Sequence, residues 1–226
     1  MLSLLSSLLI AQAAPAIVPK PDVPKVEAPK PEAPKPETIV LPQVIRVLPG
    51  RLDEILVFNS NSPEVVQTEG ILLSTFPKEG KTHPESHLNL AFQGRFDIFA
   101  HHISNQIKSP LPLKTLYLGI LLHNPGTKPI TVDVLQAASY LSQPDAPFVD
   151  LPPMTENPLG TVYAGPGDRV TNDILRRQRQ SSWPAILVIP SGTSTMLFNA
   201  PIPVKELDQP INGRSTLAYL RSSGPV

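Results

Sequence analysis

The sequence contains no cysteine. This absence excludes disulfide bonds, thiolate catalysis and cysteine-based zinc sites together. Basic and acidic residues both number 19, so the formal net charge is zero. Because affinity for nucleic acid or an anionic membrane needs a concentrated basic surface, this balance argues against both partners. Aromatic residues make up only 5% of the chain, too few for the stacking platform that is usual in sugar or single-strand binding.

Catalytic and nucleotide-binding signatures are also missing. The chain has no G-x-G-x-x-G, no G-x-S-x-G and no H-E-x-x-H, the patterns of dinucleotide-binding folds, α/β-hydrolases and zinc metalloproteases. No apolar run reaches the length of about 20 residues that a membrane-spanning helix requires. The sequence therefore predicts no cofactor and no transmembrane segment, and it favours a protein without enzymatic activity.

Residues 1–13 predict a signal peptide. Their apolar run ends in Ala11-Gln12-Ala13, which has the small-x-small form of a signal-peptidase site, so we expect cleavage after Ala13. Only the α-amino group supplies positive charge before the run, which is consistent with a start codon that lies upstream. The alternative interpretation is a frayed apolar terminus of a cytosolic protein.

Proline is abundant, with 29 residues, and its densest stretch lies within residues 14–40. From Pro15 to Glu37, lysines and acidic residues alternate on a five-residue repeat, and no face of the tract is apolar. Such composition favours polyproline II, which at about 3.1 Å per residue gives a solvated, semi-rigid rod of about 70 Å. We predict a disordered spacer that holds a domain away from a surface or threads a cell-wall layer. The alternative is an inert disordered leader.

Residues 41–226 predict an all-β domain, a mainly antiparallel, Ig-like or jelly-roll-like β-sandwich. Short apolar runs alternate with clusters of turn-forming residues at a spacing of about ten residues, which is typical of sandwiches and related barrels. The predicted strands are Val44–Val47, Ile55–Phe58, Gly70–Thr75, Leu88–Phe92, Phe96–Ala100, Leu116–Leu122, Ile130–Leu135, Phe148–Leu151, Thr161–Ala164, Ala185–Ile189, Thr195–Phe198 and Thr216–Leu220.

The segment Leu116–Leu135 is the clearest strand signal in the chain. Two β-favouring runs flank Asn124–Pro129, a cluster of residues that close turns, and this pattern predicts a β-hairpin. Apolar residues alternate cleanly with polar ones from Ile130 to Val134, whereas Leu118–Leu122 is almost continuously apolar. One of the two strands is therefore expected to be an outer strand and the other a more central one.

One short helix is predicted, over Arg169–Gln180. Asp168 would cap its N-terminus, and basic residues near its C-terminus would interact favourably with the helix dipole. Pro184 is expected to end the helix. Three arginines, with Trp183 nearby, could hold an anionic glycan or phosphate, but a solvated helix end explains them better. These arginines are Arg176, Arg177 and Arg179.

Several unusual strings occur together and in order along the chain. They are Leu48-Pro49-Gly50-Arg51-Leu52-Asp53, Phe58-Asn59-Ser60-Asn61-Ser62-Pro63-Glu64, Gly94-Arg95-Phe96-Asp97-Ile98-Phe99-Ala100-His101-His102 and Asn212-Gly213-Arg214-Ser215-Thr216-Leu217. Over Leu41 to Val226 the chain resembles a domain family of unknown function found in exported cyanobacterial proteins. The resemblance implies a secreted or envelope location and no mechanism. Members of that family are longer, so a chain truncated at its C-terminus is expected.

The most pointed polar cluster is Arg95, Asp97, His101 and His102. In an extended strand, the odd-numbered residues share one face, so Arg95, Asp97 and His101 would line a polar strip while His102 faces the other side. Together with His83 or His87, the cluster has donors that suit Zn²⁺ or Cu²⁺. The alternative, which we favour, is a buried Arg95–Asp97 pair with histidines that bond to backbone carbonyls.

The sequence as a whole predicts an exported structural or binding module of the bacterial cell envelope, in the periplasm, the outer envelope or the medium. Its partner would be a cell-envelope component: peptidoglycan, a polysaccharide or an envelope protein. The alternative is a metal-binding protein or metal-dependent hydrolase that uses Asp97, His101 and His102. A third possibility is a subunit that needs a missing C-terminal half or another chain to close the sheet, which otherwise has an unpaired edge.

Overall fold

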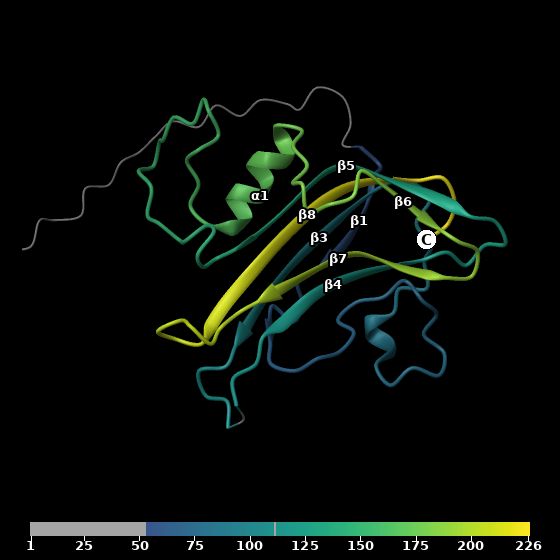
Figure 1. The fold of residues 1–226 in the computed structure, drawn as a ribbon, viewed down its shortest axis with the longest axis horizontal. Helices are drawn as coiled ribbons and strands as arrows, with labels where there is room; N and C mark the ends of the chain where they lie inside the picture. Colours follow the sequence, from purple (N-terminus) through teal and green to yellow (C-terminus); the bar gives the residue numbers. More distant parts are fainter. Residues whose placement is uncertain (1–52, 111) are drawn as a thin grey trace, which may run out of the picture. The chain divides into compact units, whose positions relative to one another are not determined.

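The computed structural model describes residues 53–110 and 112–226. These residues form strands β1 (Leu56–Ser60), β2 (Val65–Val66), β3 (Gly94–Asn105), β4 (Leu116–His123), β5 (Ile130–Leu141), β6 (Ile186–Ile189), β7 (Ser194–Ile202) and β8 (Ile211–Ser222) (Figure 1). A short 3-10 helix, η1, spans Pro84–Ser86, and the α-helix α1 spans Pro166–Leu175. The prediction of an all-β fold with one short helix is confirmed.

Several predictions concern the N-terminal part of the chain. The predicted signal peptide (1–13), the predicted spacer (14–40) and the predicted strand Val44–Val47 lie outside the described residues. Within the described residues, neither helix is long and apolar enough to cross a membrane.

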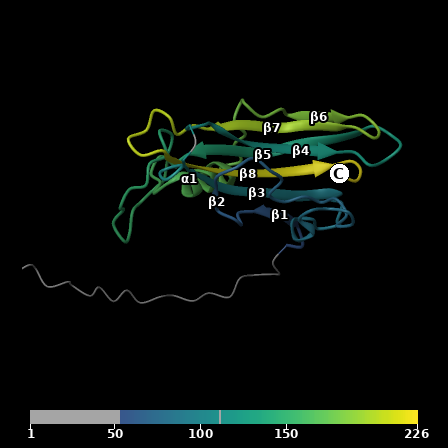
Figure 2. The ribbon, with the colours of Figure 1, turned by 90° about the horizontal axis from the view of Figure 1, so that it is seen from below.

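The strands form two sheets. The larger has six strands, in the order β1-β3-β8-β5-β6, with β2 also paired to β3, and the smaller consists of β4 and β7. Pairing is mainly antiparallel, but β1 and β2 run parallel to β3. Figure 2 shows β4 and β7 on the side of the molecule that carries β5 and β6, whereas β3 and β1 lie toward the opposite side. The smaller sheet is therefore too narrow to cover the β3 and β1 side fully.

The core lies between the two sheets and follows from alternation along the strands. In β3 every second residue from Phe96 to Ser104 is buried, and in β4 every second residue from Leu116 to Leu122 is buried. Because side chains in a strand alternate between faces, each strand contributes one apolar face to the interior. A bulge at Leu135 interrupts the pairing of β5 with β8, after which Ala137 and Leu141 continue the buried face.

The predicted hairpin over Leu116–Leu135 is wrong. Strand β4 pairs with β7, and β5 pairs with β8 and β6, so the two strands lie in different sheets. The side-chain amide of Asn124, which is fully buried, donates hydrogen bonds to the carbonyl oxygens of Ile189 (3.0 Å) and Pro190 (3.2 Å). These bonds tie the turn to the connection between β6 and β7, and the chain crosses from one sheet to the other instead of folding back beside itself.

The structure also decides which of the two strands is the inner one. The alternating strand β5 lies inside the larger sheet, between β8 and β6, and the almost continuously apolar β4 belongs to the two-stranded sheet. The sequence of β4 is almost continuously apolar because apolar residues also occupy its exposed face. Tyr117 and Leu121 point away from the core and are 62% and 58% exposed. An apolar run therefore does not by itself place a strand at the centre of a sheet.

The helix begins earlier and ends earlier than predicted. Pro166 occupies its first turn, where the missing N–H costs nothing, and Gly165 precedes it with φ 155°. The Asp168 carboxylate lies inside the first turn and accepts a hydrogen bond from the backbone N–H of Ala164 (2.9 Å). The helix ends at Leu175, before Arg177, whose φ of 60° is left-handed. The helix therefore ends well before Pro184.

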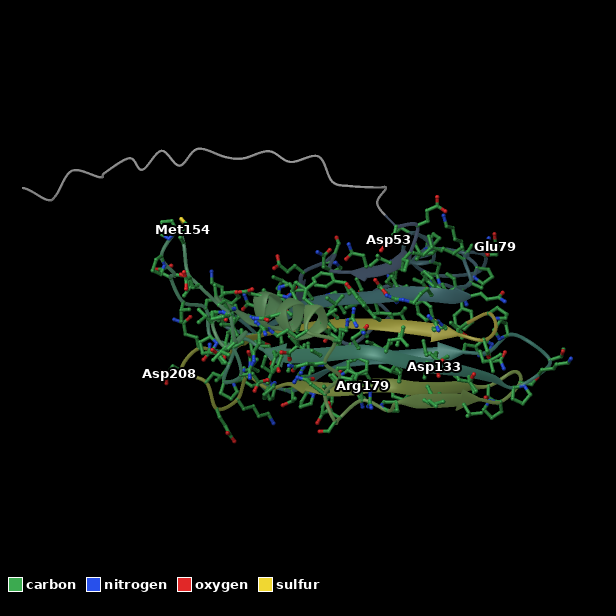
Figure 3. All side chains as sticks on the ribbon, turned by 90° about the horizontal axis from the view of Figure 1, so that it is seen from above. Asp53, Glu79, Asp133, Met154, Arg179 and Asp208 are labelled. Atoms are coloured by element: carbon green, nitrogen blue, oxygen red, sulfur yellow. The ribbon has the colours of Figure 1, made fainter. Side chains whose placement is uncertain are left out.

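Four predicted strands are loops in the structure: Gly70–Thr75, Leu88–Phe92, Phe148–Leu151 and Thr161–Ala164. Ser74 forms an isolated bridge to His87, and Phe92 exchanges two backbone hydrogen bonds of 2.9 Å with Val226. The loops that carry Met154 and Asp208 extend from one end of the sheets, and the loop that carries Glu79 lies at the other end (Figure 3). Their apolar residues pack against the sheets or face solvent without forming a further ladder.

Candidate functional site

The predicted polar strip exists on β3. Arg95, Asp97 and His101 lie at alternate positions and are half-buried, while His102 is only 2% exposed and shares the inner face with Ala100. The expected division of these residues between two faces is therefore confirmed. What each side chain contacts decides whether the strip has free groups for chemistry.

Arg95 and Asp97 form an ion pair. The Arg95 Nη1 donates to Asp97 Oδ1 at 2.5 Å and to the carbonyl oxygen of Leu220 at 3.3 Å, and the guanidinium lies over the Tyr219 ring, 4.8 Å from its centroid. Burial raises the pKa of the Asp97 carboxyl, and its bond to Arg95 only partly opposes this shift. This partly buried pair is the alternative that the sequence analysis favoured, and the two groups satisfy one another.

His101 is held on both sides of its ring. Its Nδ1 lies 2.7 Å from Ser215 Oγ on β8, and its Nε2 lies 3.1 Å from a carboxylate oxygen of Glu64. Because both ring nitrogens have partners, His101 connects β3 to β8 and to the loop before β2. It has no nitrogen left for a metal ion in this arrangement.

His102 is buried between β3 and β1. Its Nδ1 donates to the carbonyl oxygen of Pro63 at 3.0 Å, so its Nε2, 3.0 Å from Ser60 Oγ, accepts the hydroxyl proton of Ser60. Burial lowers the pKa of His102 below its usual range, and the neighbouring His101 adds to this effect. His102 is therefore a neutral ring with a single defined tautomer.

The structure does not bring the proposed metal ligands together. His101 and His102 face opposite sides of the sheet, and His83 is an exposed residue that contacts Glu85. His87 is buried in the loop beside Ser74, and its Nδ1 has no hydrogen-bond partner. Across residues 53–110 and 112–226 there is no group of three or more His, Cys, Asp or Glu side chains that could hold a metal ion.

The arginines after α1 mostly support the local fold. Arg176 donates to the Asn172 side chain at 2.8 Å and to the carbonyl oxygens of Asn157 and Pro158, both at 3.1 Å. Arg179 donates to the carbonyl oxygen of Trp183 at 2.7 Å. These two side chains anchor the surrounding loops and do not form a common binding surface.

An apolar cavity of about 300 Å³ lies between the two sheets. Its walls are the inner face of β3, the end of β1, the loop 70–76 and β4, which contributes residues from both of its faces. The cavity exists because the two-stranded sheet is narrower than the larger sheet, so a loop instead of a third strand covers β3. Its volume is at the lower end of the range of about 300–1,000 Å³ that is typical of ligand pockets.

The cavity has polar groups at its boundary. The Ser60 and His102 pair lies on the β1 and β3 wall, and His123 lies at the end of β4, with its ring 5.3 Å from that of Phe76. Most of the remaining lining is apolar, including Phe96, Ile98, Leu118 and Ile120. An apolar space with a few fixed polar groups can hold a hydrocarbon chain or ring and orient a polar end.

Sequence reasoning identified His102 but not this cavity. The alternation along Phe96–Ala100 indicated the inner wall, but the sequence contains no signal for the width of the opposite sheet. Leu118 and Ile120 were expected to lie in one sheet with β5, and the placement of β4 in the opposite sheet makes them the facing wall.

Residues 43–226 match the model of a family that is described as "Protein of unknown function (DUF3370)". No curated protein and no solved structure matches the chain. The family match agrees with the predicted membership of a family of unknown function, and it brings no activity with it.

Proposed function

Since this chain belongs to the family described as protein of unknown function (DUF3370), we propose its function from its own residues: it is an exported binding module of the bacterial cell envelope. Its partner carries an apolar group that enters the cavity between β3 and β4. The observation that carries this proposal is the cavity of about 300 Å³, which is lined mainly by apolar side chains.

The N-terminal sequence supports export. Residues 1–13 have the form of a signal peptide, and residues 14–40 have the composition of an extended spacer. A spacer of this kind holds a compact domain at a distance from its point of attachment, which suits a protein that must reach an envelope component.

The cavity supports binding of an acyl or alkyl group over binding of a sugar. Apolar groups leave water for an apolar space with a gain of about 25 cal/mol per Å² of buried surface. The polar side chains at its boundary are few, and they can orient only a small polar end: Ser60, Ser74, Thr75, His102 and His123. Among envelope components, we therefore expect lipid-bearing ones to bind and bare peptidoglycan not to bind.

Metal-dependent hydrolysis has no support from the described residues. His101 and Asp97 are each bonded to a neighbouring side chain on the outer face, and His102 is buried on the inner face. The proposal therefore rests on binding and does not include a catalytic step.

Co-sedimentation of residues 14–226, the chain that remains after the predicted cleavage, with isolated envelope fractions tests the proposal. We expect retention on outer-membrane fragments, which carry acyl chains, and none on lipid-free peptidoglycan sacculi. Ala100 lines the cavity, so the larger side chain of Ala100→Leu should occupy part of the ligand's space and reduce retention at least tenfold. Ala185→Leu is the matched control, because it adds the same side chain at an exposed position outside the cavity.

Each outcome decides a separate part of the proposal. Retention on neither fraction contradicts the envelope role. If the Ala100→Leu and Ala185→Leu variants are both retained as well as the unsubstituted chain, the cavity is not the binding site. Retention on sacculi alone contradicts the apolar nature of the ligand.

A further inference from the structure

Arg214 is a buried arginine between the two sheets. It lies on the inner face of β8 and is only 7% exposed. Its Nε and Nη2 donate to the carbonyl oxygen of Pro201 on β7, at 3.0 and 2.8 Å, and its Nη1 donates to Ser139 Oγ on β5 at 3.0 Å. A guanidinium has five N–H donors, so these bonds use only part of its capacity, and every acceptor is neutral.

Within the described residues, no carboxylate forms an ion pair with this buried charge. The ion pairs in the described part of the chain involve His83, Arg95, His101 and Lys114, and none involves Arg214. Burial lowers the pKa of the Arg214 guanidinium, and the charge of Asp145 only partly opposes this effect. Arginine nevertheless stays protonated in proteins, and a buried charge without a counter-charge is costly. Among residues 53–110 and 112–226, the site is therefore electrostatically incomplete.

A pocket of about 410 Å³ adjoins Arg214. Gln180 and Ser182, from the segment that follows α1, line it together with Asn199 of β7. Ser182 and Asn199 are exposed, so the pocket can be reached from solvent, and the buried Arg214 is one of its lining residues. It shares no lining residue with the apolar cavity between β3 and β4.

We propose that this pocket is a binding site for an oxyanion, the carboxylate or phosphate group of a ligand, and that Arg214 is the group that recognises it. The guanidinium supplies the positive charge and the donors that the protein leaves unused. Amide and hydroxyl groups at the mouth, from Asn199 and Ser182, supply further hydrogen bonds. Carboxylate and phosphate share this chemistry because both match the planar fork of arginine.

The test measures the thermal midpoint of the full chain against increasing inorganic phosphate or acetate, at constant ionic strength kept with chloride. A ligand that binds only the folded state raises the midpoint in a saturable way. We expect saturation with at least one of the two anions. Saturation with phosphate alone assigns a phosphate site, and saturation with acetate alone assigns a carboxylate site. An equal, non-saturating rise with every salt overturns the proposal.

Two variants assign the effect to the pocket. Arg214→Lys keeps the charge but removes the fork, and we expect at least tenfold weaker anion binding. Asn199→Asp leaves every bond of Arg214 in place and puts a carboxylate at the mouth of the pocket, so it should raise the midpoint without added anion and abolish the response. The Asn199→Asp variant therefore tests the anion site even if Arg214→Lys does not fold.

Asn61→Asp is the matched control for Asn199→Asp. It makes the same change of charge at an exposed loop position outside the pocket. We expect it to keep the full anion response. An undiminished response in Asn199→Asp, or an equal loss in Asn61→Asp, contradicts the assignment to this pocket.

Discussion

The indole ring of Trp183 stacks on the phenyl ring of Phe198, with the centroids 4.2 Å apart and the planes 6° from parallel. Trp183 is the only tryptophan in the chain, and it is 1% exposed. The pair joins the segment after α1 to β7. It lies beside the Arg214 pocket, since Phe198 and the neighbouring Ser182 both line that pocket. Tryptophan fluorescence therefore reports on this part of the core alone.

The stack makes Trp183 a strong contributor to stability. Trp183→Ala should lower the free energy of unfolding by about 3–5 kcal/mol, because it leaves a large cavity. Trp183→Phe should cost only about 1–2 kcal/mol, since a ring remains and the indole N–H, which has no hydrogen-bond partner, is removed. Urea unfolding followed by circular dichroism measures both variants. A cost for Trp183→Phe equal to that of Trp183→Ala would show that a phenyl ring at this position does not restore the stack on Phe198.

The crossing between the sheets depends on Asn124. Its side-chain amide donates to the carbonyl oxygens of Lys128, Ile189 and Pro190, and its Oδ1 accepts from the N–H of Gly126. Asn124→Ala leaves these buried groups without partners, so we expect a loss of about 2–4 kcal/mol in the free energy of unfolding.

Asn124→Asp should be at least as damaging at neutral pH, because it places a carboxylate against carbonyl oxygens. Chemical denaturation measures both substitutions. The control is Asn61→Ala, an exposed loop position where we expect a change within about 0.5 kcal/mol. A loss below 1 kcal/mol for Asn124→Ala would mean that the crossing does not depend on this side chain.

His102 makes stability depend on pH. Burial lowers the pKa of His102 in the folded protein, whereas in the unfolded chain this histidine has its ordinary pKa of about 6.5. As the pH falls below 6.5, the unfolded chain therefore binds more protons than the folded chain. This contribution to stability is fully present at pH values more than about one unit above 6.5. It is lost as the pH falls from the unfolded pKa through the lower pKa of the folded state. His102→Asn keeps a donor for Pro63 but cannot gain a proton.

Unfolding free energies measured between about pH 8 and pH 5 test this dependence. We expect His102→Asn to be less stable by about 1–3 kcal/mol at pH 8, because Ser60 loses its acceptor. The difference from the unsubstituted chain should shrink as the pH falls. Parallel profiles for the two proteins would show that His102 does not titrate on unfolding in this range.

The apolar cavity predicts an unequal tolerance for added volume in the core. Ala100 faces the cavity, whereas Ala137 is fully buried in the packed part of the same core. Ala100→Leu should change the free energy of unfolding by less than about 1 kcal/mol, or increase it. Ala137→Leu should cost about 1–3 kcal/mol through overpacking. Equal costs in a denaturation experiment would indicate that the space beside Ala100 is not available to a ligand.

The polar residues of β3 could be placed from the sequence because their positions depend only on local geometry. An extended strand has a period of two, so adjacent His101 and His102 must face opposite sides. Their partners could not be predicted, because Ser215, Glu64 and Ser60 come from other strands and loops. The alternative of a satisfied Arg95–Asp97 pair needed only a spacing of two residues, and the structure contains it.

The turn at Asn124–Pro129 shows where local reasoning fails. Turn-forming residues indicate that the chain reverses, but the same residues serve a hairpin within one sheet and a crossing between two sheets. The bonds that distinguish the two cases run from Asn124 to Ile189 and Pro190, far along the chain. Arg214 was missed for a similar reason, since nothing in its local sequence indicates that both sheets enclose it.

The sequence by itself determined the all-β class, the presence of strands at β3, β4 and β5, and the inward face of β3 and β5, because composition and alternation act over a few residues. It also indicated a family of unknown function, and the family match over residues 43–226 agrees with this. The tertiary structure alone decided which strands pair, how wide each sheet is, and which polar groups become buried. Those features depend on contacts between segments distant in the chain, and these contacts create both the apolar cavity and the unpaired Arg214.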